Sequence, residues 1–276
     1  NNNIFNIFNI INKFHNIFPL MISIESISKE FPEKLLFSNF SLKLKEGMRL
    51  GLVGPNGSGK TTLLKILLNI ENPDSGQINI NNNVTIGYLP QEIIAGTNRN
   101  ILEETLLAFP EVLKIEKQLN ETNINLSKSP NNKQLLSELS ILQDKFDQIN
   151  GWDIENRAKS ILNGLGFNEN QFQLPFNSFS GGWRMRCYLA GILLKKPNFL
   201  FLDEPTNHLD LQAIIWMEEF LSKWKGGLIM ISHDRSFLNK SINTILELHK
   251  GDTSLYLGNY NYYIKERNER ITHREK

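Results

Sequence analysis

The sequence predicts an α/β fold built around a parallel sheet, and three segments support this prediction. Residues 199–203 and 228–232 are short, almost wholly apolar runs, which is typical of parallel strands buried on both faces. Residues 49–53 form another apolar run, and a glycine-rich turn leads from it into an apolar helix predicted at 60–69. A buried strand, a turn and a helix in this order are typical of α/β architecture.

Weaker signals of two kinds surround these segments. Alternating apolar residues predict further strands at 22–27, 40–44, 77–80, 84–89, 244–248 and 254–257. Between Gln91 and Ser180 the pattern becomes helical, because apolar residues follow at intervals of three and four: Leu135, Leu139, Leu142, Phe146 and Ile149. A matching apolar stripe lies upstream, and a polar break at 127–132 separates the two. Residues 111–150 are therefore expected to form an antiparallel helical hairpin.

Composition limits the classes of function. The chain of 276 residues has 30 Lys and Arg against 29 Asp and Glu, so no overall field attracts it to nucleic acid or to anionic lipid. No run approaches the roughly 18 apolar residues of a membrane helix. A single cysteine, Cys187, excludes an internal disulfide and suits a reducing compartment, where it is expected to be a small packed residue. We expect a soluble, cytoplasmic protein without membrane insertion.

Residues 1–20 consist mostly of Asn, Ile and Phe and lack the features of a targeting peptide. One interpretation is a disordered or non-native leader, translated upstream of a start at Met21. The alternative is an interfacial helix, because apolar residues recur at helical spacing from Ile4 to Phe18. Such a helix usually carries more than one lysine on its polar face, which favours the leader.

The segment GPNGSGKT at 54–61 matches the phosphate-binding pattern GxxxxGK[ST], and it lies between a strand and a helix as that chemistry requires. Glycines let successive N–H groups point at phosphate oxygens, and the helix N-terminus adds positive potential. Lys60 is expected to reach the β- and γ-phosphates and the Thr61 hydroxyl to bind Mg²⁺, with a further phosphate contact from Thr62. The alternative is a glycine-rich turn with a solvated lysine.

The run NFLFLDEPTNHLD at 198–210 is an apolar strand that ends in two adjacent carboxylates. Side chains of a strand alternate in direction, so Asp203 and Glu204 point differently. We expect Asp203 to hold Mg²⁺ and Glu204 to act as the general base towards water. Two solvated acids at a strand end are the alternative.

Together with FSGGWRMR at 179–186, these motifs make residues from Ile22 to about Tyr263 resemble a nucleotide-binding domain of the ATP-binding cassette superfamily. The resemblance implies a P-loop fold with a RecA-like parallel sheet, an antiparallel β subdomain, and a helical subdomain with an inserted hairpin arm. In this family, residues corresponding to Ser180, Gly181 and Gly182 complete the site of a second cassette. A head-to-tail pair is therefore expected, formed with a second copy or with a second cassette in a longer chain.

The same resemblance assigns further positions. Gln91 in GYLPQE looks like the family glutamine that senses Mg²⁺ and the γ-phosphate, and His233 in ISHDRSF looks like the switch histidine. Asp210 resembles the D-loop acid that crosses to the partner. The ATP-binding set that this implies is Phe31, against adenine, with Gly54, Asn56, Gly57, Ser58, Gly59, Lys60, Thr61 and Thr62. The implied catalytic residues are Glu204, His233 and Gln91, and the implied Mg²⁺ ligands are Thr61, Gln91 and Asp203.

The long insertion between Gln91 and Ser180, the tryptophan of SGGWRMR and the runs DEPTNHLD and SHDRSFL are similar to ABC-F proteins. That group has two cassettes joined by a charged helical linker and acts mostly on ribosomes. The resemblance implies a leader at 1–20, a cassette at 21–258, and the start of the linker helix at 259–276. Within the cassette it implies the arm at about 105–152 and a signature subdomain at about 153–195.

Three functions remain open at this stage. The first is an ATP-driven conformational switch in translation, with ribosome, rRNA or tRNA as partners. The second is the ATP-binding subunit of a transporter, and the third is a DNA-associated ABC-F ATPase. The C-terminal segment 258–276 has five Lys or Arg against three Glu, which fits either a contact with RNA phosphates or a solvated helix.

Overall fold

The computed structural model describes residues 21–32, 34–92 and 97–274. These residues form two compact units. Of these described residues, the first unit contains those up to Tyr88, Pro197–Pro205 and those from Phe220 onwards, and the second contains those within Leu89–Lys196 and Thr206–Glu219. The leader predicted at 1–20 lies outside the described residues, as do the last two residues of the predicted linker.

A six-stranded sheet runs through the first unit in the order β5-β6-β7-β3-β8-β9. Its strands are β3 (Arg49–Val53), β5 (Ile86–Leu89), β6 (Phe199–Asp203), β7 (Gly227–Ile231), β8 (Thr244–His249) and β9 (Asp252–Tyr256). Strands β6, β7, β3 and β8 are mutually parallel, whereas β9 is antiparallel to β8. Every residue of β6 and β7 is buried, as expected for strands covered on both faces. The parallel sheet predicted from these apolar runs is confirmed.

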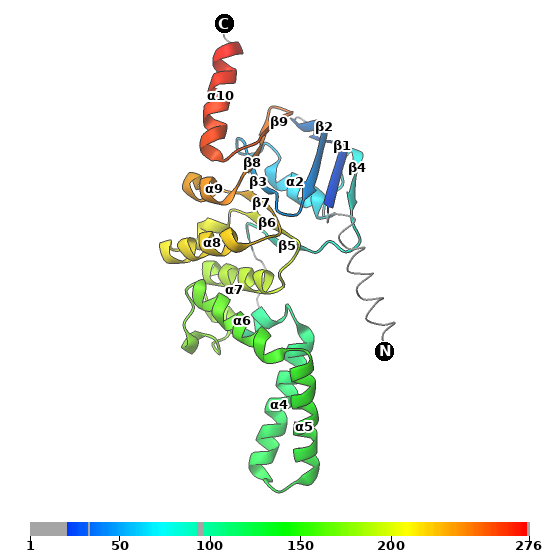
Figure 1. Cartoon of the computed structure of the whole chain (residues 1–276), viewed down its shortest axis with the longest axis vertical. Coiled ribbons are helices and arrows are strands. Elements are labelled where there is room, and N and C mark those ends of the chain that lie inside the picture. The colour runs from blue at the N-terminus through cyan, green and yellow to red at the C-terminus, as the bar shows by residue number, and fades with distance from the viewer. Residues whose placement is uncertain (1–20, 33, 93–96, 275–276) are drawn as a thin grey trace, which may run out of the picture. The chain divides into compact units, whose positions relative to one another are not determined.

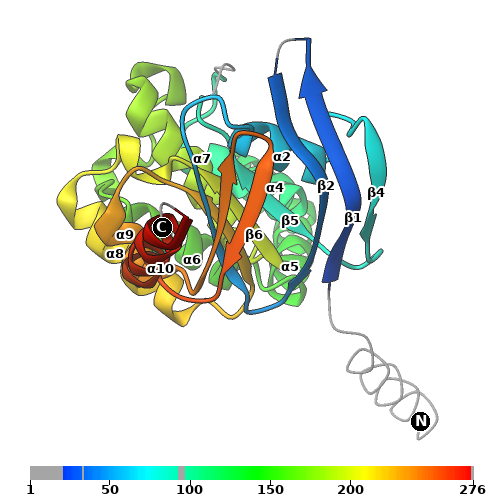
Figure 2. The ribbon, with the colours of Figure 1, turned by 90° about the horizontal axis from the view of Figure 1, so that it is seen from above.

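A second, antiparallel sheet has the order β2-β1-β4 (Figure 2). Its strands are β1 (Met21–Phe31), β2 (Lys34–Lys45) and β4 (Ser75–Ile80). Strand β1 is longer than the predicted segment 22–27 because register shifts against β2 on both sides of Ile27 let pairing continue. Bulges of this kind break the alternation of apolar residues on which the prediction depended.

Helix α2 (Lys60–Leu67) fastens the loop after β3 to the core. Its buried residues Leu63, Leu64, Ile66 and Leu67 join a cluster with apolar side chains from both sheets. The helix ends before the predicted 69 because Asn69 adopts a left-handed conformation with φ of 55°. The Ile70 N–H then donates to the Lys65 carbonyl at 2.9 Å, which caps the helix end.

The second unit is helical. Its helices are α3 (Ile101–Leu106), α4 (Pro110–Lys128), α5 (Lys133–Gln148), α6 (Gly151–Gly164), α7 (Gly181–Leu194) and the greater part of α8 (Leu211–Lys223), with single 3-10 turns at Glu169–Gln171, Phe176–Ser178 and Pro205–His208. Cys187 of α7 is fully buried beside the Thr105 hydroxyl, 3.6 Å away. Burial raises the pKa of its thiol to about 12. The expectation of a small packed cysteine is confirmed.

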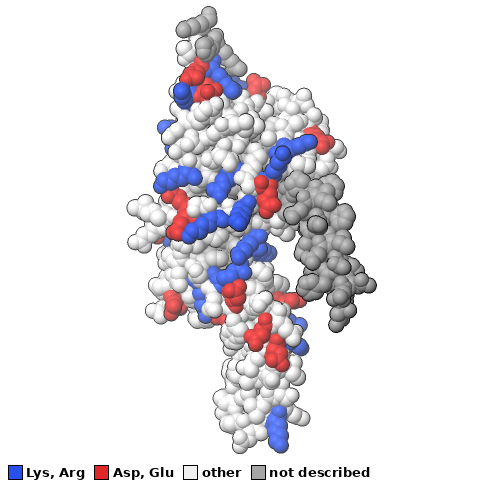
Figure 3. All heavy atoms as spheres, viewed as in Figure 1, with Lys and Arg blue, Asp and Glu red and all other residues white. Residues whose placement is uncertain are grey.

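The predicted helical hairpin is present, and α4 and α5 lie side by side (Figure 1). The amide side chain of Asn132 begins α5 by accepting hydrogen bonds from the N–H groups of Gln134 and Leu135. The apolar stripes face inward, with Leu119, Leu142 and Phe146 buried. Residues 111–150 carry five Lys and six acids, and on the face drawn in Figure 3 the two signs are mixed over the hairpin.

The first unit ends with α9 (Arg235–Ser241) and α10 (Tyr260–Arg274). Helix α10 lies within residues 259–276, for which the start of a linker helix is predicted. Within 21–32, 34–92 and 97–274, no helix has both the length and the hydrophobicity to cross a membrane.

In the second unit, the surroundings of the Glu116 carboxyl disfavour its charged form. Glu116 on α4 is half-buried, and one of its carboxylate oxygens has no hydrogen-bond partner. Burial, followed by the charges of the nearby acids Glu155 and Glu103, raises its pKa from 4.5 to about 7, and Lys159 opposes this shift. The folded state therefore keeps a proton that the unfolded chain releases near pH 4.5. The free energy of unfolding therefore falls as the pH rises from about 4.5 to about 7.

We expect Glu116→Gln to be more stable than the wild type at pH 8 by about 1 kcal/mol, a value reduced for partial exposure. The difference should shrink towards zero at pH 5, where the wild-type carboxyl is neutral. Urea unfolding at both pH values measures it, with the exposed Glu121→Gln on the same helix as control. A difference that does not depend on pH would contradict the argument.

Candidate functional site

Glycines fix the shape of the loop between β3 and α2. Gly54 and Gly59 have φ values of 149° and 99°, which side chains rarely tolerate. A Cβ on Gly54 would lie 2.3 Å from the carbonyl oxygen of Leu248 on β8. Gly59 is the N-cap of α2 and offers no side-chain hydrogen bond, so the first N–H groups of the helix have no side-chain cap. Such N–H groups are suited to bind an anion.

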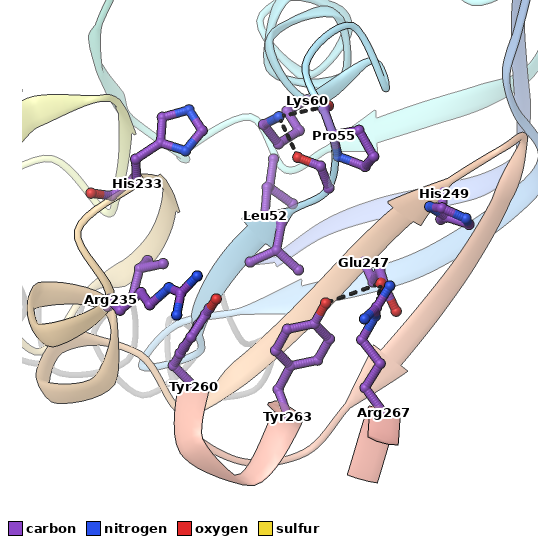
Figure 4. A pocket seen from close by; sticks show the side chains of 14 residues that line it. Leu52, Pro55, Lys60, His233, Arg235, Glu247, His249, Tyr260, Tyr263 and Arg267 are labelled. Carbon is purple, nitrogen blue, oxygen red and sulfur yellow. Dashed lines mark hydrogen bonds and ion pairs between the residues drawn. The ribbon is translucent and has the colours of Figure 1, made fainter. Parts of the chain in front are cut away.

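Lys60 closes over this loop. Its ammonium group donates to the carbonyl oxygens of Gly54 at 2.9 Å and Pro55 at 3.1 Å (Figure 4). Burial lowers the pKa of Lys60, and the negative charges of Glu204 and Asp203 act against this shift. A cation with two acids beside it thus lies where the loop would hold phosphate.

Thr61 and Asp203 form the second part of the site. The Thr61 hydroxyl donates to a carboxylate oxygen of Asp203 at 2.9 Å, which joins the start of α2 to the end of β6. Burial raises the pKa of Asp203, while the hydrogen bond from Thr61 and the charge of Lys60 oppose the shift. A hydroxyl and one carboxylate suit Mg²⁺, which usually takes one or two protein oxygens together with phosphates and water.

Glu204 and His233 form the third part. Glu204 directly follows β6 with φ of 52°, an uncommon conformation for a residue with a side chain. One of its carboxylate oxygens accepts a hydrogen bond from the backbone N–H of His233 at 3.1 Å, and the other lies 3.5 Å from the His233 Nε2. Glu204 is buried, whereas the His233 side chain is 69% exposed. A buried carboxylate is therefore held beside an accessible imidazole.

The other predicted ATP-binding residues belong to the same unit. Phe31 ends β1 with 47% of its surface exposed, and the Lys29 ammonium lies 5.6 Å from its ring centre. Lys29 itself is held by Asp74 at 3.0 Å. Ser58 is buried, and its hydroxyl has no hydrogen-bond partner among the described residues. Asn56, Gly57 and Thr62 complete the predicted set on the loop and the first turn of α2.

The remaining predicted residues belong to the second unit. Gln91 lies at an exposed bend that follows β5. Ser180 is the N-cap of α7 without a side-chain hydrogen bond, and Gly181 has open space around its Cα. The start of this helix therefore resembles the start of α2 in the first unit, because both leave backbone N–H groups without a side-chain cap.

Sequence reasoning missed one residue of this region, Arg186. Its guanidinium group donates to the His208 carbonyl at 2.8 Å, to the Leu165 carbonyl at 3.1 Å and to Asp210 at 2.9 Å. It also stacks on the Trp183 ring at 4.5 Å. An arginine among the apolar residues of a helix was the available signal, since buried charges are found paired.

Asp210 is thus engaged within its own unit. One carboxylate oxygen accepts from the backbone N–H of Ala213 at 2.9 Å, and the other accepts from Arg186. These contacts, the one to Ala213 first, lower the pKa of Asp210. The acid caps the start of α8 and joins it to Arg186 of α7.

A phosphate-type loop before a helix, with two acids at the end of another parallel strand of the same sheet, defines a P-loop nucleotide-binding domain. The family model described as ABC transporter matches residues 37–207. The chain therefore belongs to the ABC transporter family, a class of cassette ATPases.

Individual relatives agree with this assignment. The chain is 36% identical over 250 residues to the uncharacterized ABC transporter ATP-binding protein YfmR of Bacillus subtilis. This match covers 91% of this chain and 39% of that protein. It is 35% identical to ABC transporter F family member 5 of Arabidopsis thaliana, with 91% of this chain and 37% of that protein covered. The chain thus spans about two fifths of the length of these relatives.

Solved structures share the fold. An ATP-binding cassette described as a dimer in a post-hydrolysis state, bound to ADP and Pi, matches with a TM-score of 0.58 and 19% identity. The match covers 86% of this chain and 98% of that one.

We expect Gly54→Ala to destroy the loop, because its Cβ would overlap the Leu248 carbonyl. Binding of a fluorescent ATP analogue should fall at least about tenfold, and stability should fall by roughly 2 kcal/mol. Gly191→Ala is the matched control, since its added Cβ would come no closer than 3.4 Å to another atom, the Thr105 carbonyl oxygen. Equal analogue binding by both variants would show that the close approach is unimportant.

Proposed function

We propose that this chain binds ATP with Mg²⁺ at the loop between β3 and α2 and hydrolyses the γ-phosphate bond. The observation that carries the proposal is the meeting of polar side chains where the neighbouring parallel strands β6, β7 and β3 end. They are Lys60, Thr61, Asp203, Glu204 and His233. Parallel sheets commonly bind ligands at this edge.

Binding follows from groups already in place. The Lys60 ammonium would exchange the two loop carbonyls for the β- and γ-phosphates. The N–H groups at the start of α2 would hold phosphate oxygens, and the exposed face of Phe31 would pack on adenine. Thr61 and Asp203 would hold Mg²⁺, and the ion would neutralise phosphate charge.

Hydrolysis needs a base near the γ-phosphate. Glu204 fits this role because its carboxylate is buried and is oriented by the backbone N–H of His233. It would accept a proton from the attacking water, while the His233 imidazole would donate a hydrogen bond to the γ-phosphate. The positive φ of Glu204 supports this assignment, since strained residues of this kind cluster at active sites.

A second cassette is part of the proposal. Ser180, Gly181 and Gly182 would act on the nucleotide of that partner, because the uncapped start of α7 offers N–H donors to a phosphate. The solved cassette described as a dimer supports a pair of this kind. The partner would be a second copy of this chain or another cassette of a longer protein.

We further propose that closure of the pair drives a conformational switch on the ribosome, in the cytoplasm. The likeness to F family members and the helical hairpin α4–α5 support this role. The mixed charges of the hairpin fit a contact with protein or with the shape of RNA better than a basic RNA-binding surface.

We expect Glu204→Gln to bind ATP as the wild type does and to lose turnover by at least about 100-fold, because only the base is removed. Released phosphate should be measured against protein concentration for both chains. A wild-type rate per molecule that rises with concentration shows that the pair is the active species. Unchanged turnover in the variant would exclude Glu204 as the base.

Glu204→Gln should also sediment with ribosomes in the presence of ATP, because the closed pair cannot reopen by hydrolysis. Lys60→Ala, which lacks the phosphate contact, is the control that should remain in the supernatant. Parallel assays with membranes and with branched DNA test the transporter and DNA functions. Recovery with membranes alone would contradict the ribosomal role.

A further inference from the structure

The start of strand β2 lies against the phosphate loop of the first unit. A Cβ on Gly59 would lie 3.0 Å from the Cβ of Leu36, which is buried. A Cβ on Gly57 would lie 3.2 Å from the Nζ of Lys34. In both Figure 1 and Figure 2, β2 lies beside α2, the helix that follows the loop. The loop therefore has an apolar contact at Gly59 and an ammonium group beside Gly57, both supplied by β2.

Lys34 is also the cross-strand partner of Phe31. Strand β1 ends at Phe31, β2 begins at Lys34, and these two residues pair directly. Side chains of directly paired residues lie on the same face of a sheet, with Cβ atoms about 5 Å apart. The Lys34 side chain thus starts beside the ring that is proposed to pack on adenine, and it ends beside the loop that is proposed to hold phosphate. It spans the same interval as a bound nucleotide would.

The ammonium group of Lys34 is available to a ligand. Lys34 is exposed, and no residue that the structure describes forms a hydrogen bond or an ion pair with its side chain. Lys29 also lies near the Phe31 ring, but its situation differs. Its ammonium group is paired with Asp74 at 3.0 Å and with Glu71 at 3.5 Å. The charge of Lys29 is therefore used within the protein, whereas Lys34 brings a positive charge to the loop that no described acid pairs with.

We propose that Lys34 is a further nucleotide-binding residue, whose ammonium group donates to a phosphate oxygen of the nucleotide beside Gly57. This role rests on the proposed function, because it requires a nucleotide whose base packs on Phe31 and whose phosphates enter the loop. A contact between an ammonium group and a phosphate is a charge-assisted hydrogen bond. Because Lys34 is exposed, dissolved salt should weaken this contact.

The experiment compares the wild-type chain with Lys34→Gln in the binding of a fluorescent, non-hydrolysable ATP analogue with Mg²⁺. At low salt the variant should bind about three- to tenfold more weakly, because one charge-assisted contact is lost. The ratio of the two dissociation constants should fall towards one at about 1 M salt, where the Debye length is about 3 Å. Lys34→Arg keeps the charge and should bind nearly as the wild type does.

Lys43→Gln is the matched control, because it removes the same charge from another exposed position of β2. It should leave the affinity for the analogue unchanged. Without nucleotide, all of these variants should unfold at nearly the same temperature as the wild type, since substitutions at exposed positions usually change stability little.

The outcomes separate the role of Lys34 from the proposed function. Equal binding by Lys34→Gln and the wild type at low salt, together with poor binding by Lys60→Ala, would overturn the role of Lys34 and leave the proposed function standing. A loss that is the same at high salt, or the same in Lys34→Arg, would also overturn it, because the side chain would then act on the shape of the loop. Failure of the wild type to bind the analogue would overturn the proposed function, and the role of Lys34 with it.

Discussion

The pairing register of three parallel strands is the constraint on which the site depends. Asp203 of β6 pairs with Ile231 of β7, and Ile231 pairs with Leu52 of β3, so the three strands end at nearly the same level. Glu204, His233 and the phosphate loop follow these strands in the chain. They therefore lie together at the carboxyl ends of the strands, although they are far apart in the sequence. A shift of one residue in any pairing would move these groups apart and turn alternate side chains to the other face.

Most residues of the site at the carboxyl ends of these strands could be predicted from the sequence, because each belongs to a pattern of a few neighbouring residues. An apolar run that ends in two acids, and a glycine-rich turn before a helix, each specify a backbone conformation within a few residues. The hairpin was predictable for the same reason, since its apolar spacing of three and four describes one helix face. The bulged strand β1 was predicted too short, because pairing with β2 overrides its local pattern.

Contacts between distant residues could not be predicted in this way. Arg186 and Asp210 lie 24 positions apart, and Glu247 and Arg267 lie 20 apart. In each pair an ordinary surface charge becomes structural only once the fold brings its partner close. Asp210 is the clearest example, because its motif suggests a contact with a second cassette and does not indicate its partners within this chain. In the structure its oxygens are used to cap α8 and to hold Arg186.

These two ion pairs have different surroundings. The Arg186 side chain is 9% exposed, so removal of Asp210 alone would leave a buried charge without its partner, which is costly. The Arg267 side chain is 36% exposed, and its partner Glu247 has two tyrosine hydroxyls as well. The connection of α10 to β8 therefore depends on a network, whereas the connection between α7 and α8 depends more on one side chain.

The burial of Cys187 has a practical consequence for studies of motion. Its sulfur is covered on all sides, and its raised pKa leaves almost no thiolate near neutral pH. The natural chain should therefore react poorly with maleimides and methanethiosulfonates. Single cysteines added at exposed positions of the hairpin or of α10 can carry fluorophores or spin labels without a cysteine-free background. Distances between such labels, measured with and without nucleotide, would then report the motion of the labelled helices.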